Sequence, residues 1–472
     1  MFDPVIAPSG TLLGLLQRGR GDGTLHALAA PRAEALAALN HCVLNDPRHD
    51  WQAENRSLYY ARLYLDLHGS LQEIERHLCD TDDHLDTDEA RTGLALAVLG
   101  HLASYGRGDA LSLLRRYATN GANWAWALDE LALRDNDSGL RALAPAVLAR
   151  FPATPEGNAE LATTIRDAFE PRPWRLWAED GREAIGARVR AAQEAGSFDR
   201  WQRQLRPTGP RPGWSVQAVF DWADQAVERG SALHVPAARC LSAVAGPEDR
   251  PAIVEAARQG SEGARCAALH YLAESCDPVV LDLIEAAVSG GSRTVADAAV
   301  AAFERMCGDE AVDRARGWVH RPDALGASAA GVLACRGSAK DATLVLGALR
   351  EAVRADGPDA PLLWTLVDGA GRLGIGCAAP VLRHVYRETA SSQLRGRAAR
   401  ALAATDSSFR TGFAVECLWD CEETTREVAA LHAETGDVRV AERLRRLAAD
   451  PAEEAEVQTA VRSRIGPDMP AI

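Results

Sequence analysis

Several features that would place the 472-residue sequence in a broad class are missing from it. It has no run of about 18 or more apolar residues, so we expect no membrane-spanning helix. Residues 1–10 lack a basic segment followed by an apolar core, which predicts no signal peptide and a cytoplasmic location. Aromatic residues make up only 6% of the chain, and this scarcity disfavours a sheet protein.

Lysine is almost absent, because Lys340 is the single lysine and arginine supplies nearly all of the 52 basic residues. The 66 acidic residues outnumber them and give a net charge of −14. Binding along a nucleic-acid backbone normally needs a basic face, so the balance argues against a nucleic-acid partner. We interpret the arginine bias as GC-rich coding, in keeping with a bacterial source.

The motifs of common enzyme classes are missing as well. We find no Gly-x-Ser-x-Gly elbow, no glycine-rich phosphate loop ending in Lys-Ser/Thr, and no His-Glu-x-x-His. Whether two of the many acidic residues form a catalytic pair is left open by the sequence. We therefore predict no catalytic residue and no cofactor, and we favour a protein that is not an enzyme.

Two stretches superficially suggest metal binding. Cys417 and Cys421 are four residues apart and share a helical face, but structural zinc needs a second pair of ligands. The acidic run 80–89 would need glycine and glutamate at the sixth and twelfth positions of an EF-hand loop, where Leu85 and Arg91 stand. We predict no metal site, two buried thiols and a solvated acidic loop.

What the sequence does contain is a motif that recurs about every thirty residues. Small residues and one large apolar residue share a helical stripe in 264–272, 295–303 and 394–402. The large residues serve as landmarks of the repeats: Leu241, Leu272, Phe303, Leu333, Leu373, Leu402 and Leu431. Their spacings of 31, 31, 30, 40, 29 and 29 predict two helices per repeat, with a longer loop near 354–361.

The segment 395–402, Arg-Gly-Arg-Ala-Ala-Arg-Ala-Leu, resembles the second-helix motif of HEAT-like repeats, of the subclass first noted in phycobilisome lyases. The resemblance covers roughly 232–450. It is weaker in the first half, where Leu67, Leu102 and Leu131 are spaced 35 and 29 apart. It implies an all-α fold, an α-solenoid of stacked antiparallel helix pairs. Proteins of this family are mainly scaffolds and adaptors.

The repeat pattern breaks near 169–229, which predicts three parts. These are an N-terminal HEAT-like half at 1–168, a junction at 169–230 and a C-terminal HEAT-like half at 231–472. Five of the eleven tryptophans lie in the junction, where seven arginines stand against three acids between residues 181 and 213. The junction is either a structural connection or a binding surface, because tryptophan and arginine are enriched at interface hot spots. The candidate binding residues are Trp174, Trp177, Arg200, Trp201, Arg203, Arg211, Trp214 and Trp222.

The N-terminal segment 10–45 is expected to be helical, with a break at Gly19-Arg20-Gly21-Asp22-Gly23. Its Arg-Gly-Asp triplet looks like an adhesion motif. In a chain that we expect to be cytoplasmic we interpret the triplet as part of a loop.

These observations favour a non-catalytic scaffold or adaptor that binds a partner protein or peptide. The resemblance leaves two alternatives. One is a lyase-type helper that attaches or modifies a prosthetic group. The other is a DNA-binding solenoid similar to the HEAT-like alkylation-repair glycosylases, for which the tryptophans fit but the acidic balance does not. Interleaved aromatic and arginine residues in the junction can also hold single-stranded nucleic acid.

Overall fold

The computed structural model describes residues 6–48, 52, 54, 56–79, 89–204 and 213–465. Within these ranges the structure has twenty-eight α-helices and no strand, which confirms the predicted all-α solenoid of packed helix pairs. No helix in the described part of the chain has both the length and the apolarity needed to cross a bilayer. Contacts divide the chain into two compact units. Unit 1 is Met1–Arg206, Tyr386–Ala399 and Ser407–Ile472, and unit 2 is Pro207–Val385 and Arg400–Asp406.

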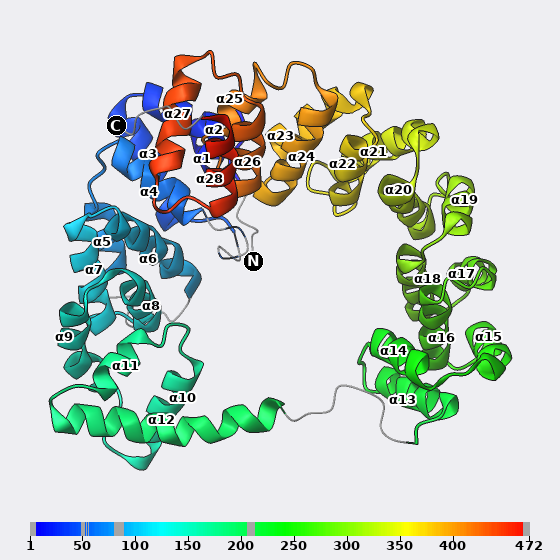
Figure 1. Cartoon of the computed structure of the whole chain (residues 1–472), viewed down its shortest axis with the longest axis horizontal. Coiled ribbons are helices and arrows are strands. Elements are labelled where there is room, and N and C mark those ends of the chain that lie inside the picture. Colours follow the sequence, from blue (N-terminus) through cyan, green and yellow to red (C-terminus); the bar gives the residue numbers. More distant parts are fainter. Residues whose placement is uncertain are drawn as a thin grey trace. The chain divides into compact units, whose positions relative to one another are not determined.

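Unit 2 is a regular stack of helix pairs (Figure 1). Its helices are α13 (Val216–Glu228), α14 (His234–Val244), α15 (Arg250–Gln259), α16 (Glu262–Glu274), α17 (Val279–Val288), α18 (Arg293–Arg305), α19 (Asp309–Trp318), α20 (Ala324–Arg336), α21 (Ala342–Asp356) and α22 (Leu363–Arg372). The helices of each pair pack on one another, and the second helices α14, α16, α18 and α20 also pack on their successors. Alanine-rich stripes permit this close stacking, which joins the apolar faces into one continuous core.

Most of the predicted landmarks lie in the core. Leu241, Leu272, Phe303, Leu333 and Leu402 are at most 1% exposed. Two predictions were wrong. Leu373 is a half-buried residue that caps the end of α22, and Leu431 on α26 (Glu423–His432) is 42% exposed.

The reason for the error on α26 lies in its neighbours. Ala429 and Ala430 are both fully buried, and α26 packs extensively on α28 (Ala455–Arg464). Small residues make the close helix contact, which leaves the bulky Leu431 beside the contact rather than in it.

Arginines near the ends of the second helices brace successive pairs. Arg372, in the last turn of α22, donates to three backbone carbonyls at the C-terminal end of α20. Arg336, in the last turn of α20, donates to two carbonyls at the end of α18. Carbonyls at a helix C-terminus lack hydrogen-bond donors within the helix and carry partial negative charge. The flat guanidinium group can donate to several of these carbonyls at once. The arginine bias therefore has a structural role as well as a coding origin.

Replacing Arg372 by lysine tests this role. We expect a loss of about 1–2 kcal/mol in the free energy of unfolding, because one ammonium group cannot reach all three carbonyls. Arg354→Lys is the matched control, since Arg354 only pairs with Glu351 on the exposed surface of α21. Urea unfolding of the full chain measures both variants. Equal stability of the two would contradict a bracing role for Arg372.

Unit 1 is built from both ends of the chain. Its N-terminal helices are α1 (Leu12–Arg18), α2 (Gly21–Ala29), α3 (Arg32–Leu44), α4 (Ser57–Asp66), α5 (Gln72–Leu78), α6 (Glu89–Ser104), α7 (Gly108–Asn120), α8 (Trp124–Arg134), α9 (Asp137–Leu148), α10 (Pro155–Asp167), α11 (Arg172–Ala178) and α12 (Glu183–Gln204). Its C-terminal helices are α25 (Phe413–Cys417), α26, α27 (Val438–Ala449) and α28. The helices α23 (Ala379–Glu388) and α24 (Ser392–Thr405) run across the boundary between the units.

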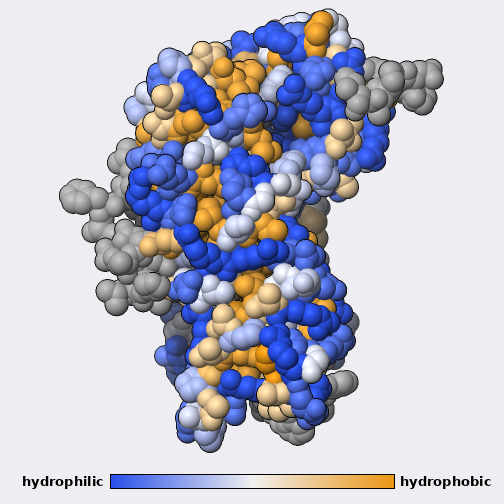
Figure 2. Space-filling view, turned by 90° about the vertical axis from the view of Figure 1, so that its left-hand side faces the viewer, coloured by the Kyte–Doolittle hydropathy of each residue, from blue (hydrophilic) through white to orange (hydrophobic). Residues whose placement is uncertain are grey.

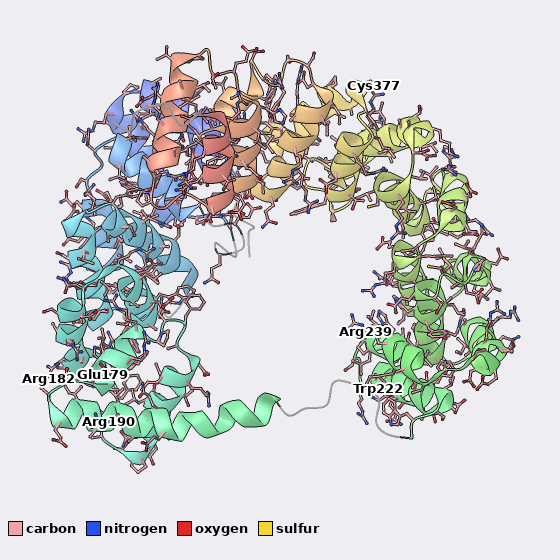
Figure 3. The ribbon with its side chains drawn as sticks, in the orientation of Figure 1. Glu179, Arg182, Arg190, Trp222, Arg239 and Cys377 are labelled. Carbon is pink, nitrogen blue, oxygen red and sulfur yellow. The ribbon has the colours of Figure 1, made fainter. Side chains whose placement is uncertain are left out.

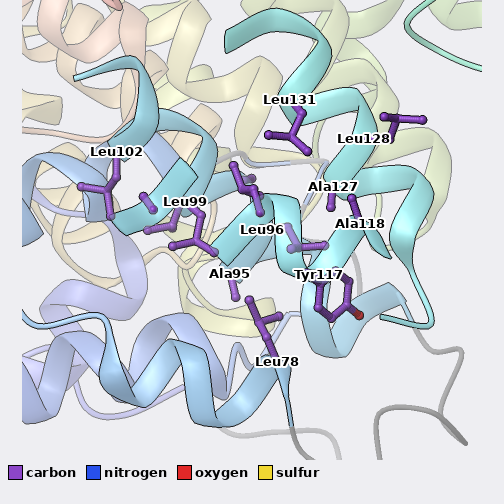
Figure 4. Packing of buried hydrophobic residues seen from close by; sticks show 14 of the residues in the cluster. Leu78, Ala95, Leu96, Leu99, Leu102, Tyr117, Ala118, Ala127, Leu128 and Leu131 are labelled. Carbon is purple, nitrogen blue, oxygen red and sulfur yellow. The ribbon is translucent and has the colours of Figure 1, made fainter. Parts of the chain in front are cut away.

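The N-terminal helices of unit 1 share one apolar core. Leu96 and Leu99 of α6 lie in the same buried cluster as Tyr117 of α7 and Leu131 of α8 (Figure 4). The side that carries α3, α5, α7 and α9 shows apolar side chains in strips between charged ones (Figure 2). The core of this half is therefore formed by the apolar stripes of its helices, as the spacing of apolar residues in the sequence predicts.

The two ends of the chain meet through close backbone contacts. The backbone N–H of Cys421 donates to the carbonyl of Gly19 at 2.9 Å. A Cβ atom on Gly21 would lie 1.8 Å from the carbonyl oxygen of Glu416. Gly19 caps α1 in the left-handed conformation, and α2 begins at Gly21. The prediction that the Arg-Gly-Asp triplet is part of a loop was therefore wrong for Gly21 and Asp22, which begin α2 at the docking point for the C-terminal helices.

Buried ion pairs follow the same junction. The guanidinium of Arg395 binds the carboxylate of Asp420 at 2.8 and 3.0 Å, and both side chains are fully buried. Arg426 binds Glu453 in a second buried pair at 2.6 Å. Arg62 of α4 reaches the same Glu453 at 3.0 Å. Arg426 also donates to the carbonyls of Asp420 and Cys421, and the bond from Arg62 to Glu453 ties the N-terminal helices to the C-terminal ones.

Candidate interaction surface

Trp174 and Trp177, two of the predicted binding residues, lie in the core of unit 1. Both belong to α11, and their rings pack edge to face with centroids 4.9 Å apart. Trp177 is fully buried and donates its indole N–H to the carbonyl of Leu140 at 2.8 Å. A buried indole whose polar group is satisfied is typical of a packing residue.

The next four predicted residues cannot be placed on a surface. Arg200, Trp201 and Arg203 lie on α12, but their side chains are outside the described residues. Arg211 and the acidic residues at 80–88 also fall outside them.

Other arginines of the predicted junction form ion pairs and hydrogen bonds within unit 1. Arg182 pairs with Asp180 at 2.6 Å and holds the pKa of that carboxyl well below its usual range. Arg190 donates to the carbonyl of Ala178 at 2.5 Å (Figure 3). Arg188 donates to three carbonyls between residues 148 and 152. These contacts brace α11 and α12 in the same way as the arginines of unit 2.

Trp214 and Trp222, the last two predicted residues, form a half-buried aromatic pair at the start of unit 2. Their ring centroids are 5.4 Å apart, with the rings tilted by 56°. Ser215 caps α13 by accepting a hydrogen bond from the N–H of Ala218. The buried stripe of α13 is formed by Val219, Phe220, Ala223 and Ala226, which leaves Trp222 off the stripe and open to solvent.

A pocket of about 420 Å³ opens next to this pair, between α13, α14, α16 and α18. Its lining is mainly apolar or small and consists of Ala223, Val227, Gly230, Ser231, Ala232, Leu233, His234, Gly263, Cys266, Thr294, Asp297 and Ala298. Gly263 allows α16 to approach α13 closely, since a Cβ there would lie 2.5 Å from the backbone of Ala223. Trp222 immediately precedes the lining residue Ala223 on α13, so the pocket and the aromatic pair lie at the same end of unit 2, although neither indole lines the pocket.

Among the residues described, the unpaired charges at this end of unit 2 include Glu228 and Arg229 at the end of α13 and a guanidinium on α14. Arg239 on α14 is exposed and has no hydrogen-bond or ion-pair partner within the described ranges (Figure 3). Asp224, which follows the lining residue Ala223, accepts from the N–H of Ala264 at 3.1 Å, and the lining carboxylate of Asp297 is 70% exposed and lies 3.7 Å from Arg293. The surface therefore combines an apolar pocket with an exposed carboxylate, two half-exposed indoles and exposed guanidinium groups.

One wall of the pocket leads to a stacked pair of histidines. His234 lines the pocket, and its ring lies parallel to that of His270, with centroids 4.7 Å and planes 17° apart. His270 is fully buried, and neither ring nitrogen has a hydrogen-bond partner among the residues described. Burial, reinforced by His234 and Arg305, lowers the pKa of His270 to about 4. Partial burial lowers the pKa of His234 as well.

Other cavities offer less to a partner. One cavity of about 760 Å³ lies in unit 1 and is lined by Arg32, Leu36, Leu65 and Arg107 among others. Both guanidinium groups already donate to backbone carbonyls at residues 67–69. A cavity whose charged groups are satisfied by its own backbone has little left to recognise a ligand.

The described residues contain no group of three or more histidine, cysteine, aspartate or glutamate side chains placed to hold a metal ion. Cys417 is fully buried as predicted, whereas Cys421 is only half-buried. Burial raises the pKa of Cys421 to about 11, which leaves it a protonated thiol at neutral pH.

Sequence reasoning missed Arg239, His234 and His270. The signal for His270 was present, because it is a polar residue inside the apolar motif 264–272. The other two could be found only by knowing which helices lie next to α13.

Comparison of the sequence with models of known protein families and with curated proteins gives no match. The similarity to HEAT-like repeats therefore rests on the motif 395–402 and on the paired helices.

Proposed function

We propose that this protein is a cytoplasmic, non-catalytic scaffold of the HEAT-like kind, which binds a partner protein or peptide at the α13–α14 end of unit 2. The observation that carries the proposal is the half-exposed pair Trp214–Trp222 beside an apolar pocket and the unpaired Arg239. Tryptophan and arginine next to a concave apolar site are the usual composition of an interface hot spot. A stacked helical array with exposed anchors is typical of proteins that hold partners.

The surface also favours one chemistry of the partner. The pocket has room for an apolar side chain, and its lining carboxylate Asp297 lies 3.7 Å from Arg293. Arg239 is a free positive charge at the same end of unit 2, so an acidic group on the partner gains a charge-assisted hydrogen bond there. We therefore expect a segment that presents an aliphatic or aromatic residue close to a carboxylate.

A displayed library of random peptides, selected against the full chain, tests the proposal. We expect selected peptides to share an apolar residue near an acidic one and to bind at least ten times more weakly to Trp222→Ala, a loss of about 1.4 kcal/mol or more. Arg239→Glu is expected to weaken binding further, because it repels the carboxylate.

Phe169→Ala is the matched control, since Phe169 is 82% exposed and lies in unit 1. It removes an exposed aromatic ring without touching the α13–α14 surface. Failure to select any peptide, or equal losses of binding in Trp222→Ala and Phe169→Ala, would contradict the proposed site.

A further inference from the structure

We propose that the stacked pair His234–His270 makes this surface pH-sensitive, so that acidification loosens α13 and α14 from α16 and releases the partner. Loosening is a property of the chain alone, and only the release of the partner rests on the function proposed above.

The pair is placed where α14 meets α16. His234 is the first residue of α14, and His270 lies within α16, which packs on both α13 and α14. The parallel rings, 4.7 Å between centroids, form a direct contact between the two helices. Two neutral imidazoles can stack in this way, whereas an imidazolium needs water or an acceptor for each N–H. Neither ring nitrogen of His270 has an acceptor within the described residues.

No negative group compensates a positive charge on His270. The groups that act on it are His234 from α14 and Arg305 from α18, and both oppose protonation. Glu274, one turn further along α16, is bound to Arg305 at 2.9 Å. No group of α13 or α17 acts on the ring within the described part of the chain. Protonation therefore favours any arrangement in which α14 moves away and water reaches the ring.

The pKa of His270 sets the direction and the size of the effect. It is about 4 in the closed arrangement, against a usual value of 6.5. Because the pKa of His270 is lower in the closed arrangement, this group stabilises the closed arrangement fully at pH values above 6.5. The stabilisation is lost as the pH falls toward 4. Between pH 7.5 and pH 5.0 this single group shifts the balance toward the open arrangement by roughly 30-fold.

The opening acts on the proposed binding residues. Trp222 belongs to α13 and Arg239 to α14, and the pocket is formed where these helices contact α16 and α18. If α13 and α14 separate from α16, the pocket wall and both anchors are displaced. A partner that binds only the closed arrangement then has a lower apparent affinity, because a smaller fraction of the molecules is closed.

Hydrogen–deuterium exchange of the full chain at pH 7.5 and 5.0, corrected for intrinsic exchange rates, measures the opening without any partner. We expect protection of residues 216–244 to fall by about tenfold or more at pH 5.0 in the wild type. His270→Leu is expected to abolish most of this loss. His101→Leu is the matched control, because His101 is a largely buried histidine of α6 in unit 1 whose pKa is also lowered to about 4.

Unchanged protection in the wild type at pH 5.0, or equal effects of His270→Leu and His101→Leu, would overturn the proposal. If His270→Leu alters the helical circular dichroism, His270→Phe and His234→Leu replace it, with the same expected result. The selected peptides separate the two proposals. Binding that Trp222→Ala leaves unchanged at both pH values argues against the binding site, whereas binding that is lost in Trp222→Ala but is equally tight to the wild type at pH 7.5 and 5.0 argues against the histidine pair alone.

Discussion

Gly21→Ala is expected to lower the free energy of unfolding by more than about 3 kcal/mol and to separate the N-terminal helices from the C-terminal ones. The added methyl group would lie 1.8 Å from the carbonyl oxygen of Glu416, 2.8 Å from its carbon and 3.0 Å from the nitrogen of Asp420. These are backbone atoms, so no side-chain rotation relieves the overlap. Overpacking against fixed atoms forces the helices apart, and the contacts around them are lost with it.

Gly10→Ala is the matched control, because a Cβ on Gly10 meets no atom within 4 Å. We expect it to change stability by less than about 0.5 kcal/mol. Urea unfolding of the full chain, followed by circular dichroism, compares the two variants. Near-identical unfolding curves for Gly21→Ala and the wild type would show that α2 does not dock on α25 as described.

Asp420→Asn is expected to cost about 3–5 kcal/mol, because it leaves the guanidinium of Arg395 buried without a counter-charge. Both side chains are fully buried, and the carboxylate receives two hydrogen bonds from Arg395. Burial lowers the pKa of Arg395, but the charge and hydrogen bonds of Asp420, together with Cys421 and Tyr386, hold that pKa well above its usual range. A guanidinium keeps its proton in proteins, so after the substitution Arg395 is a buried charge without the carboxylate that it binds.

The double variant Arg395→Met/Asp420→Leu separates the charge from the packing. We expect it to be much more stable than Asp420→Asn alone, since a buried pair replaced by apolar groups is often nearly neutral. Glu255→Gln is the control on an exposed pair with Arg258, where less than about 0.5 kcal/mol is expected. Thermal unfolding of the full chain checks all three. Similar losses for the exposed and the buried pair would contradict the role assigned to Arg395.

The fold of unit 2 could be predicted because its signal is local. The alanine stripes and their spacing of about thirty residues lie within single helices, and Leu272 and Phe303 are buried as predicted. Leu431 was misplaced because hydrophobicity alone does not tell which face of a helix makes the close contact. There the small residues make it, and the leucine lies beside them.

The junction of the chain ends could not be predicted. Gly19 and Gly21 look like turn glycines in the sequence, and their contact partners Cys421 and Glu416 lie about four hundred residues away. Nothing in the local pattern indicates which distant backbone a glycine approaches. The same holds for the candidate surface, where composition singled out Trp214 and Trp222 together with two core tryptophans. Only the packing of α11 and α13 separates the buried indoles from the exposed ones.

The most direct test of the proposed binding surface is to map where a selected peptide touches the chain. A photo-reactive residue placed beside the apolar anchor of the peptide, followed by mass spectrometry, identifies the contact. Our account predicts cross-links to α13 and α14, within residues 214–244, and their loss in Trp222→Ala. Cross-links confined to unit 1, or to α19–α22, would contradict it.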